Sequence, residues 1–204
     1  MSSALAASDA LAKAGIYGFL AAVFGSHPTP ESVSALPAIA AELGIACPAG
    51  LSLQELDAEY MALFVVPGPR YTAPYESVFR DEFLLPAVLP RGSNPGETGC
   101  TIKGLLMGDS TLAVRRCYLE AALLPEEDLP DHIANELRFL AYLSASEAQA
   151  ISGLGERFRR EHISQWIGEL RERIVERESL GFYGAAIRVA EALLQEDDSR
   201  PPAG

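Results

Sequence analysis

The sequence is short of basic residues, and this deficit argues against one class of function. Its 204 residues include 16 lysine and arginine residues against 28 aspartate and glutamate residues, which gives a formal charge of −12 and an isoelectric point near 4.7. A nucleic-acid-binding surface needs basic side chains to neutralise phosphates. We therefore do not expect a nucleic-acid partner, whereas a cationic partner is compatible with this charge.

Long apolar runs and paired cysteines are also lacking. No run reaches the roughly 18 apolar residues that a membrane-spanning helix needs, and the N-terminal segment has no basic stretch ahead of an apolar core, as a secretory signal would. The three cysteines, Cys47, Cys100 and Cys117, form no C-x-x-C motif. We therefore expect a cytoplasmic protein with reduced thiols and no stable membrane insertion.

Signatures of catalysis and of cofactor binding are missing as well. The sequence has no glycine-rich phosphate loop, no G-x-S-x-G motif and no Glu-x-x-His pair. His27, His132 and His162 are scattered, and Cys117 lies in an apolar helical pattern typical of a core residue. For His162 and for Trp166, four residues later, packing is the favoured interpretation. The sequence thus predicts no catalytic residues, no metal site and no cofactor.

Helical periodicity dominates what is present. Apolar residues recur at helical spacing in six segments, at about 16–24, 33–43, 53–64, 109–124, 133–141 and 183–194, and a long charged helix is predicted over 156–177. Thr29 and the Ser52–Glu55 capping box begin two of these helices, and Pro37 is expected to kink or split one. Because no convincing alternating strand is found, we predict an all-α, single-domain helical bundle over residues 1–195, with a disordered tail at 196–204.

One segment, residues 65–104, interrupts the helical pattern. It holds six of the fourteen prolines, and forty residues without periodicity inside a compact domain are usually functional or disordered. Its second half, about 86–102, has the composition of a loop insertion. We expect this insertion to be dispensable for folding.

The first half of that segment is the most informative part of the sequence. Residues 59–79 read EYMALFVVPGPRYTAPYESVF, in which prolines stiffen a loop that carries Tyr71, Tyr75 and Phe79. A stiff aromatic loop at a helix end fits a binding surface. Aromatic residues in such loops often only cover the core, and this segment alone favours that second interpretation.

A polar pair, Asp131 and His132, lies where a later helix begins. An aspartate in the first turn of a helix complements the macrodipole and satisfies free N–H groups. From the residues alone, this structural role is favoured over a binding role.

Five segments in a fixed order resemble the TorD/DmsD/NarJ-type family of cytoplasmic chaperones that mature molybdenum-containing oxidoreductases. They are Tyr60-x-x-Leu63-Phe64 with the loop up to Pro74-Tyr75-Glu76-Ser77-Val78-Phe79, then Gly108-Asp109-Ser110-Thr111-Leu112 with Val114-Arg115-Arg116, Pro130-Asp131-His132-Ile133, Phe158-x-x-x-His162-Ile163-x-x-Trp166, and Phe182-Tyr183. The resemblance covers the chain from about Tyr17 to Leu194. Two departures are Tyr75, where the family often has tryptophan, and a longer segment between Phe79 and Gly108.

The resemblance implies an all-helical protein without an enzymatic reaction of its own. Such chaperones bind a twin-arginine leader peptide or the body of the apo-enzyme until the cofactor is loaded. Carried over by position, the expected client-binding residues are Tyr60, Leu63, Phe64, Pro74, Tyr75, Glu76, Asp131 and His132. Because a leader presents guanidinium groups beside an apolar stretch, its receptor needs carboxylates near an apolar groove, and Asp131 and Glu76 are the expected carboxylates.

Two other functions stay open at this point. One is a nucleotide-binding or nucleotide-hydrolysing protein, since guanine-nucleotide binding has been proposed within the family. The other is a helical ligand-binding module without a client enzyme. A homodimer, including a domain-swapped one, is also compatible with such a fold.

Overall fold

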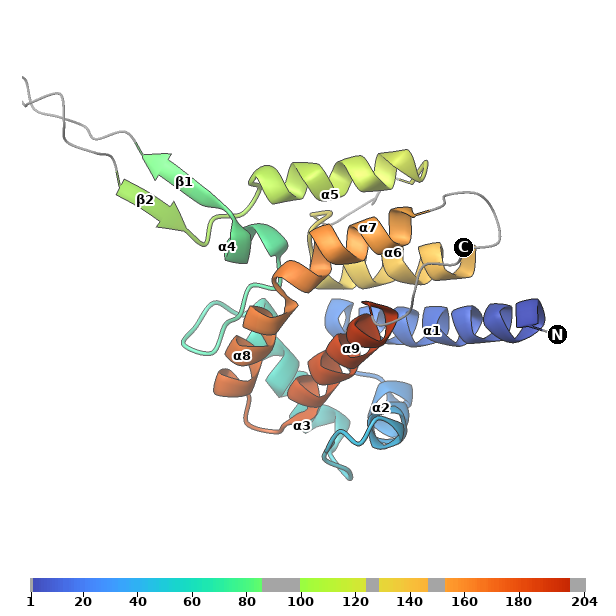
Figure 1. The fold of residues 1–204 in the computed structure, drawn as a ribbon. Coiled ribbons are helices and arrows are strands. Elements are labelled where there is room, and N and C mark those ends of the chain that lie inside the picture. Colours follow the sequence, from blue (N-terminus) through green and yellow to red (C-terminus); the bar gives the residue numbers. More distant parts are fainter. Residues whose placement is uncertain (1, 86–99, 124–128, 147–152, 199–204) are drawn as a thin grey trace, which may run out of the picture.

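The computed structural model describes residues 2–85, 100–123, 129–146 and 153–198, and in these it is a helical bundle with one small hairpin (Figure 1). The helices are α1 (Ser2–Gly25), α2 (Pro30–Glu42), α3 (Leu53–Tyr60), α4 (Glu76–Arg80), α5 (Asp109–Glu120), α6 (Ile133–Ser146), α7 (Leu154–Glu161), α8 (Ile167–Arg177) and α9 (Phe182–Asp198). The strands are β1 (Glu82–Leu85) and β2 (Cys100–Lys103). The predicted all-α fold class is confirmed. In these described segments, no helix combines the length and apolar character needed to cross a bilayer.

Two predicted helix starts are confirmed. The Thr29 hydroxyl accepts a hydrogen bond from the Ser32 N–H at 3.2 Å. Ser52 and Glu55 form the predicted capping box, with Ser52 N–H donating to Glu55 Oε2 at 2.9 Å. Helix α2 continues through Pro37, so the expected split does not occur. Proline removes a single N–H from the ladder, and the remaining turns of α2 tolerate that loss.

Small residues let α1 and α6 lie close together along their length (Figure 1). A Cβ added to Gly25 would lie only 2.9 Å from the Cβ of Ala134, so this crossing leaves no room for a side chain there. The α1–α6 pair forms one wall of the core. Phe24 of α1 enters that core from the end of the same helix.

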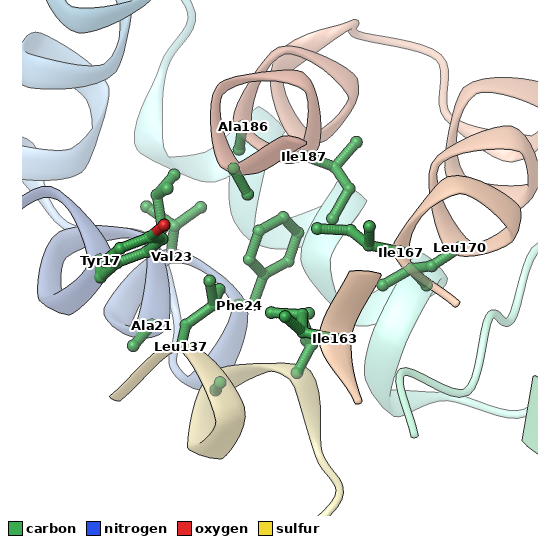
Figure 2. Close-up of a cluster of buried hydrophobic side chains, with 14 of the residues drawn as sticks. Tyr17, Ala21, Val23, Phe24, Leu137, Ile163, Ile167, Leu170, Ala186 and Ile187 are labelled. Carbon is green, nitrogen blue, oxygen red and sulfur yellow. The ribbon is translucent and has the colours of Figure 1, made fainter. Parts of the chain in front are cut away.

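The apolar core is formed by the apolar residues that recur at helical spacing in the predicted helices. In Figure 2 the ring of Phe24 lies at the centre of this cluster, with Leu137, Ile163 and Ile187 around it. Each of these four side chains exposes 1% or less of its surface. Burial of this kind contributes roughly 1.5–3 kcal/mol for each large side chain, and it is the main term that holds the bundle together.

The prediction of one continuous helix over 156–177 is wrong. Helix α7 ends at Glu161, and a short 3₁₀ turn over Ile163–Gln165 precedes α8. His162 leaves helical geometry, with φ −118° and ψ −95°, because its ring is held by groups on other elements. The apolar periodicity continues across the break between α7 and α8, so the sequence pattern does not reveal this break.

The segment without a predicted element contains structure. Residues 76–80 form α4, and β1 pairs antiparallel with β2, placing Glu82 opposite Lys103 and Leu85 opposite Cys100. The expectation of no strands is therefore wrong, and β2 includes residues 100–102 of the predicted insertion. Elements of four or five residues are too short for periodicity to detect. Residues 86–99 lie outside the described residues.

The last described element is helix α9. Helix α9 extends through residues 196–198, which were assigned to the tail, whereas residues 199–204 lie outside the described part.

Asp81 fastens the base of the hairpin to α5. Its carboxylate accepts from the N–H of Ser110 at 3.0 Å and from the Ser110 hydroxyl at 2.5 Å. A Cβ on Gly108 would lie 1.9 Å from Asp81 Oδ2, so glycine is required at that point. We call Asp81, Gly108 and Ser110 the hairpin clamp.

Candidate functional site

The first group of predicted client-binding residues lies in the core. Leu63 is fully buried, and Tyr60 and Phe64 each expose only 8%. Their rings pack on Tyr183, with centroid distances of 6.2 Å for Tyr60 and 5.2 Å for Phe64. Leu63 and Phe64 belong to a π-helical turn over Met61–Val65, a rare geometry that is frequent at functional sites. Only a narrow edge of this group reaches solvent.

The second group brings together two segments that are far apart in the sequence. The Pro74 carbonyl accepts from Ile133 N–H, and Asp131 O accepts from Glu76 N–H, both at 2.9 Å. These bonds make an isolated antiparallel bridge between Tyr75 and His132, whose rings meet edge to face at 4.9 Å. Tyr75 and His132 are half-buried, whereas Pro74 is buried. We call Tyr75 and His132 the aromatic pair.

Asp131, expected to be a client-binding carboxylate beside an apolar groove, is fully buried. Its Oδ2 accepts from the N–H of Ser77 at 3.0 Å, and Ser77 lies in the first turn of α4. Asp131 therefore caps the helix that follows the aromatic loop, not the helix that it precedes in sequence. Among the residues that the structure describes, its second oxygen, Oδ1, has no hydrogen-bond partner.

Glu76 is also fully buried, and its charge is satisfied inside the protein. It pairs with Arg80 one turn later, and both of its oxygens lie within 3.2 Å of His162 Nδ1. The carboxylate thus joins α4 to the break between α7 and α8. A cation on a client would have to compete with two internal ones for this group.

Further buried polar residues complete this network. His162 Nε2 lies 3.6 Å from the Cys117 sulfur, and Trp166 Nε1 donates to Glu136 Oε2 at 3.2 Å. The sequence pattern favoured packing for His162 and Trp166, and it did not single out Glu136. One signal was available: Glu136 falls three residues after Ile133, so it lies on the apolar stripe of α6.

We call Glu76, Asp131, Glu136 and His162 the polar core, and the surroundings shift the pKa values of Glu136 and His162. Burial raises the pKa of Glu136 well above its usual range, and the nearby Glu76 carboxylate raises it further. Burial alone would lower the pKa of His162, but its hydrogen bonds with Cys117 and Glu76 raise that pKa to about 9. At neutral pH, His162 is therefore a cation, and the folded protein favours the protonated form of Glu136.

Cys117, His162 and Glu76 have the order of a nucleophile, a base and an orienting acid, which sequence reasoning did not foresee. Cys117 exposes only 8% of its surface, so a substrate has little access to the thiol. We assign the arrangement to structure. Within the described residues, no three His, Cys, Asp or Glu side chains are placed to hold a metal ion.

A cavity of about 250 Å³ lies where α1 ends and α2 begins. It is small beside ligand pockets, which start at roughly 300 Å³. None of the predicted client-binding residues lines it, although His27, which does, contacts the ring of Tyr60 at 5.3 Å.

Comparison with known proteins gives a consistent result. The model of a family described as nitrate reductase delta subunit matches residues 29–172, a span that contains every predicted client-binding residue. The chain is 29% identical over 154 residues to the chaperone protein TorD of Vibrio cholerae serotype O1, covering 70% of this chain and 60% of that protein. It is 27% identical over 150 residues to the chaperone protein TorD of Shewanella pealeana, covering 72% and 60%. The chain thus spans about 60% of the length of these curated relatives.

Proposed function

The chain belongs to the nitrate reductase delta subunit family, and from this premise we propose that it is a maturation chaperone for a molybdenum-containing oxidoreductase subunit. In this proposal it acts in the cytoplasm, binds the subunit or its twin-arginine leader, and assists cofactor insertion before export. The curated relatives are named as chaperones, which favours this role over nucleotide hydrolysis.

The aromatic pair is the observation that carries the proposal. Tyr75 and His132 are half-buried at a bridge between two chain segments, and the fold fixes both rings by backbone hydrogen bonds. A preformed surface loses little conformational freedom on binding, which favours affinity. Aromatic rings accept both apolar side chains and stacked guanidinium groups, the two features of a twin-arginine leader.

In this proposal the other predicted residues act by positioning the pair. Asp131 and Glu76 hold α4, which begins directly after Tyr75. Tyr60, Leu63, Phe64 and Pro74 are buried, and the Leu63 carbonyl accepts from the N–H of Thr72, in the loop before Tyr75, at 2.7 Å. The net charge of −12 attracts a cationic leader at longer range.

Leader binding by Tyr75→Ala tests the proposal. Truncating an aromatic anchor removes roughly 1–2 kcal/mol of binding, so we expect affinity for synthetic twin-arginine leader peptides to fall about 5- to 30-fold by calorimetric titration. Tyr142→Ala is the matched control, because Tyr142 is 40% exposed on α6 and does not belong to the pair.

Two outcomes are separable. If the wild type binds neither leader peptides nor an apo-oxidoreductase subunit, the proposed function is wrong. If the wild type binds and Tyr75→Ala binds equally well, the function stands and the aromatic pair is not its site.

A further inference from the structure

Helix α5 has an exposed apolar face that the described residues leave uncovered. Leu112 and Leu119 each expose 52%, and they share one face because they are seven residues apart. Directly before the helix, Leu105, Leu106 and Met107 expose 43%, 46% and 70%. In Figure 1, α5 lies along the outside of the helical body. Large apolar side chains gathered on a surface mark an interaction site.

The segment before α5 is held in this exposed arrangement. Met107 has φ +67°, a left-handed conformation that is unfavourable for a residue with a Cβ. The next residue, Gly108, is fixed by the hairpin clamp. Local strain of this kind persists only where the surroundings impose it, and here the result is an outward-facing methionine.

Charged residues flank this face in a specific order. The side chains of Asp109, Arg115 and Arg116 are exposed, and none of them has a hydrogen bond or ion pair with the described part of the chain. Asp109 precedes Leu112 by three residues and Arg116 follows it by four, so both lie on the same side of the Leu112 stripe. Arg115 lies on the opposite side of that stripe.

We propose that this face binds a second copy of the chain, with the two α5 helices antiparallel about a twofold axis beside Leu112. In this arrangement Asp109 of one copy lies opposite Arg116 of the other. The apolar segment before α5 lies opposite Leu119 of the other copy. A twofold interface uses the same patch on both subunits, so it requires a self-complementary surface.

The charge order favours a second copy over an unrelated partner. A different protein would need an apolar stripe with an acidic and a basic residue in the inverse order. Helix α5 already carries an acidic residue, Asp109, and a basic residue, Arg116, on the same side of its apolar stripe. A second copy in antiparallel orientation therefore presents the inverse order. The face shares no residue with the aromatic pair, so this inference does not depend on the proposed function.

Sedimentation velocity of the full chain, from micromolar to hundreds of micromolar, measures the dimer. Arg116→Asp places like charges opposite each other, and we expect the dissociation constant to rise about tenfold or more. The double variant Asp109→Arg/Arg116→Asp restores opposite charges and should return the constant to within about threefold of the wild type. Arg115→Asp makes the same charge change at the neighbouring position and should have the smaller effect.

A second variant separates dimer contact from folding. Met107→Gly removes exposed apolar surface and relieves the left-handed strain, so we expect an equal or higher melting temperature together with a weaker dimer. A wild type that stays monomeric at every concentration would overturn the proposal. So would a double variant that stays as weak as Arg116→Asp, or a Met107→Gly variant that dimerises as the wild type does.

Discussion

The interior has an apolar half around Phe24 and a polar half around Glu76, and the two are equally well buried. Phe24 exposes 1% of its surface, while Glu76, Asp131 and Glu136 expose none. In the apolar half, every side chain that is removed from water stabilises the folded protein. The polar half stabilises the folded protein only if each charged group is paired, because an unpaired buried charge is strongly destabilising. Apolar packing thus supplies stability, whereas the polar core permits few alternative arrangements.

A substitution in the apolar half should cause the largest loss of stability. Phe24→Ala removes a ring at the centre of the cluster, and we expect it to lower the free energy of unfolding by about 3–5 kcal/mol. Chemical denaturation measures the change, with Leu11→Ala as control, since Leu11 is 67% exposed on the same helix. A loss below about 1 kcal/mol for Phe24→Ala would mean that the core closes over the missing ring.

Two substitutions distinguish members of the polar half. Glu76→Gln leaves the His162 cation and Arg80 without their anion, so we expect a loss of about 3 kcal/mol. Because burial raises the pKa of Glu136 and so favours its protonated form, Glu136→Gln replaces that acid by an amide of the same shape, and we expect a loss of at most about 1 kcal/mol. Urea unfolding at neutral pH compares the two. Equal losses would show that Glu136 is ionised in the folded protein.

The polar half should also make stability depend on pH. The pKa of His162 is raised from 6.5 in the unfolded chain to about 9 in the folded protein. Its stabilisation is therefore fully present below pH 6.5 and is lost as pH rises through about 9. This contribution is on the order of 3 kcal/mol.

The His162→Gln variant isolates that contribution. The difference in unfolding free energy between wild type and variant should shrink steadily from pH 6 to pH 9.5 on thermal or urea unfolding, because only the wild type loses a bound proton. Glu136 also has a raised pKa, but it is present in both proteins. A difference that is constant with pH would show that folding does not raise the pKa of His162.

The smallest effect is expected at Asp131. Asn keeps an oxygen that can accept from Ser77 N–H, so Asp131→Asn should lower stability by about 1 kcal/mol or less. Because the carboxylate is fully buried, leader affinity and its salt dependence should stay unchanged. A fall in affinity at low salt, with stability preserved, would return Asp131 to the binding surface.

The apolar half could be predicted from the sequence because its signal is local. Ile163, Ile167, Leu170 and Ile174 recur at helical spacing, and all four are buried. The helix starts at Thr29 and Ser52 were readable for the same reason, since each cap involves residues three positions apart. The hairpin was missed because its two short strands pair across a long excursion of the chain.

The polar half could not be predicted in this way because its partners are distant in sequence. Glu76 meets His162, and Asp131 meets Ser77, through contacts that no periodicity encodes. Asp131 illustrates the difference: a capping role was foreseen, but for the wrong helix. The resemblance to a chaperone family selected the segments that form the aromatic pair, and whether those residues bind a client stays a prediction.

The hairpin clamp has a consequence for how this chain can be varied. Asp81 and Ser110 join the two points where the chain leaves and re-enters the helical body, so the excursion between them is closed at its base. Its length can then change without moving α4 or α5, because loop closure depends only weakly on length. Homologues could gain or lose residues between Asp81 and Ser110 without a change in the packing of the helices. The same position offers a place to insert a fluorescent reporter or an affinity tag in the middle of the chain.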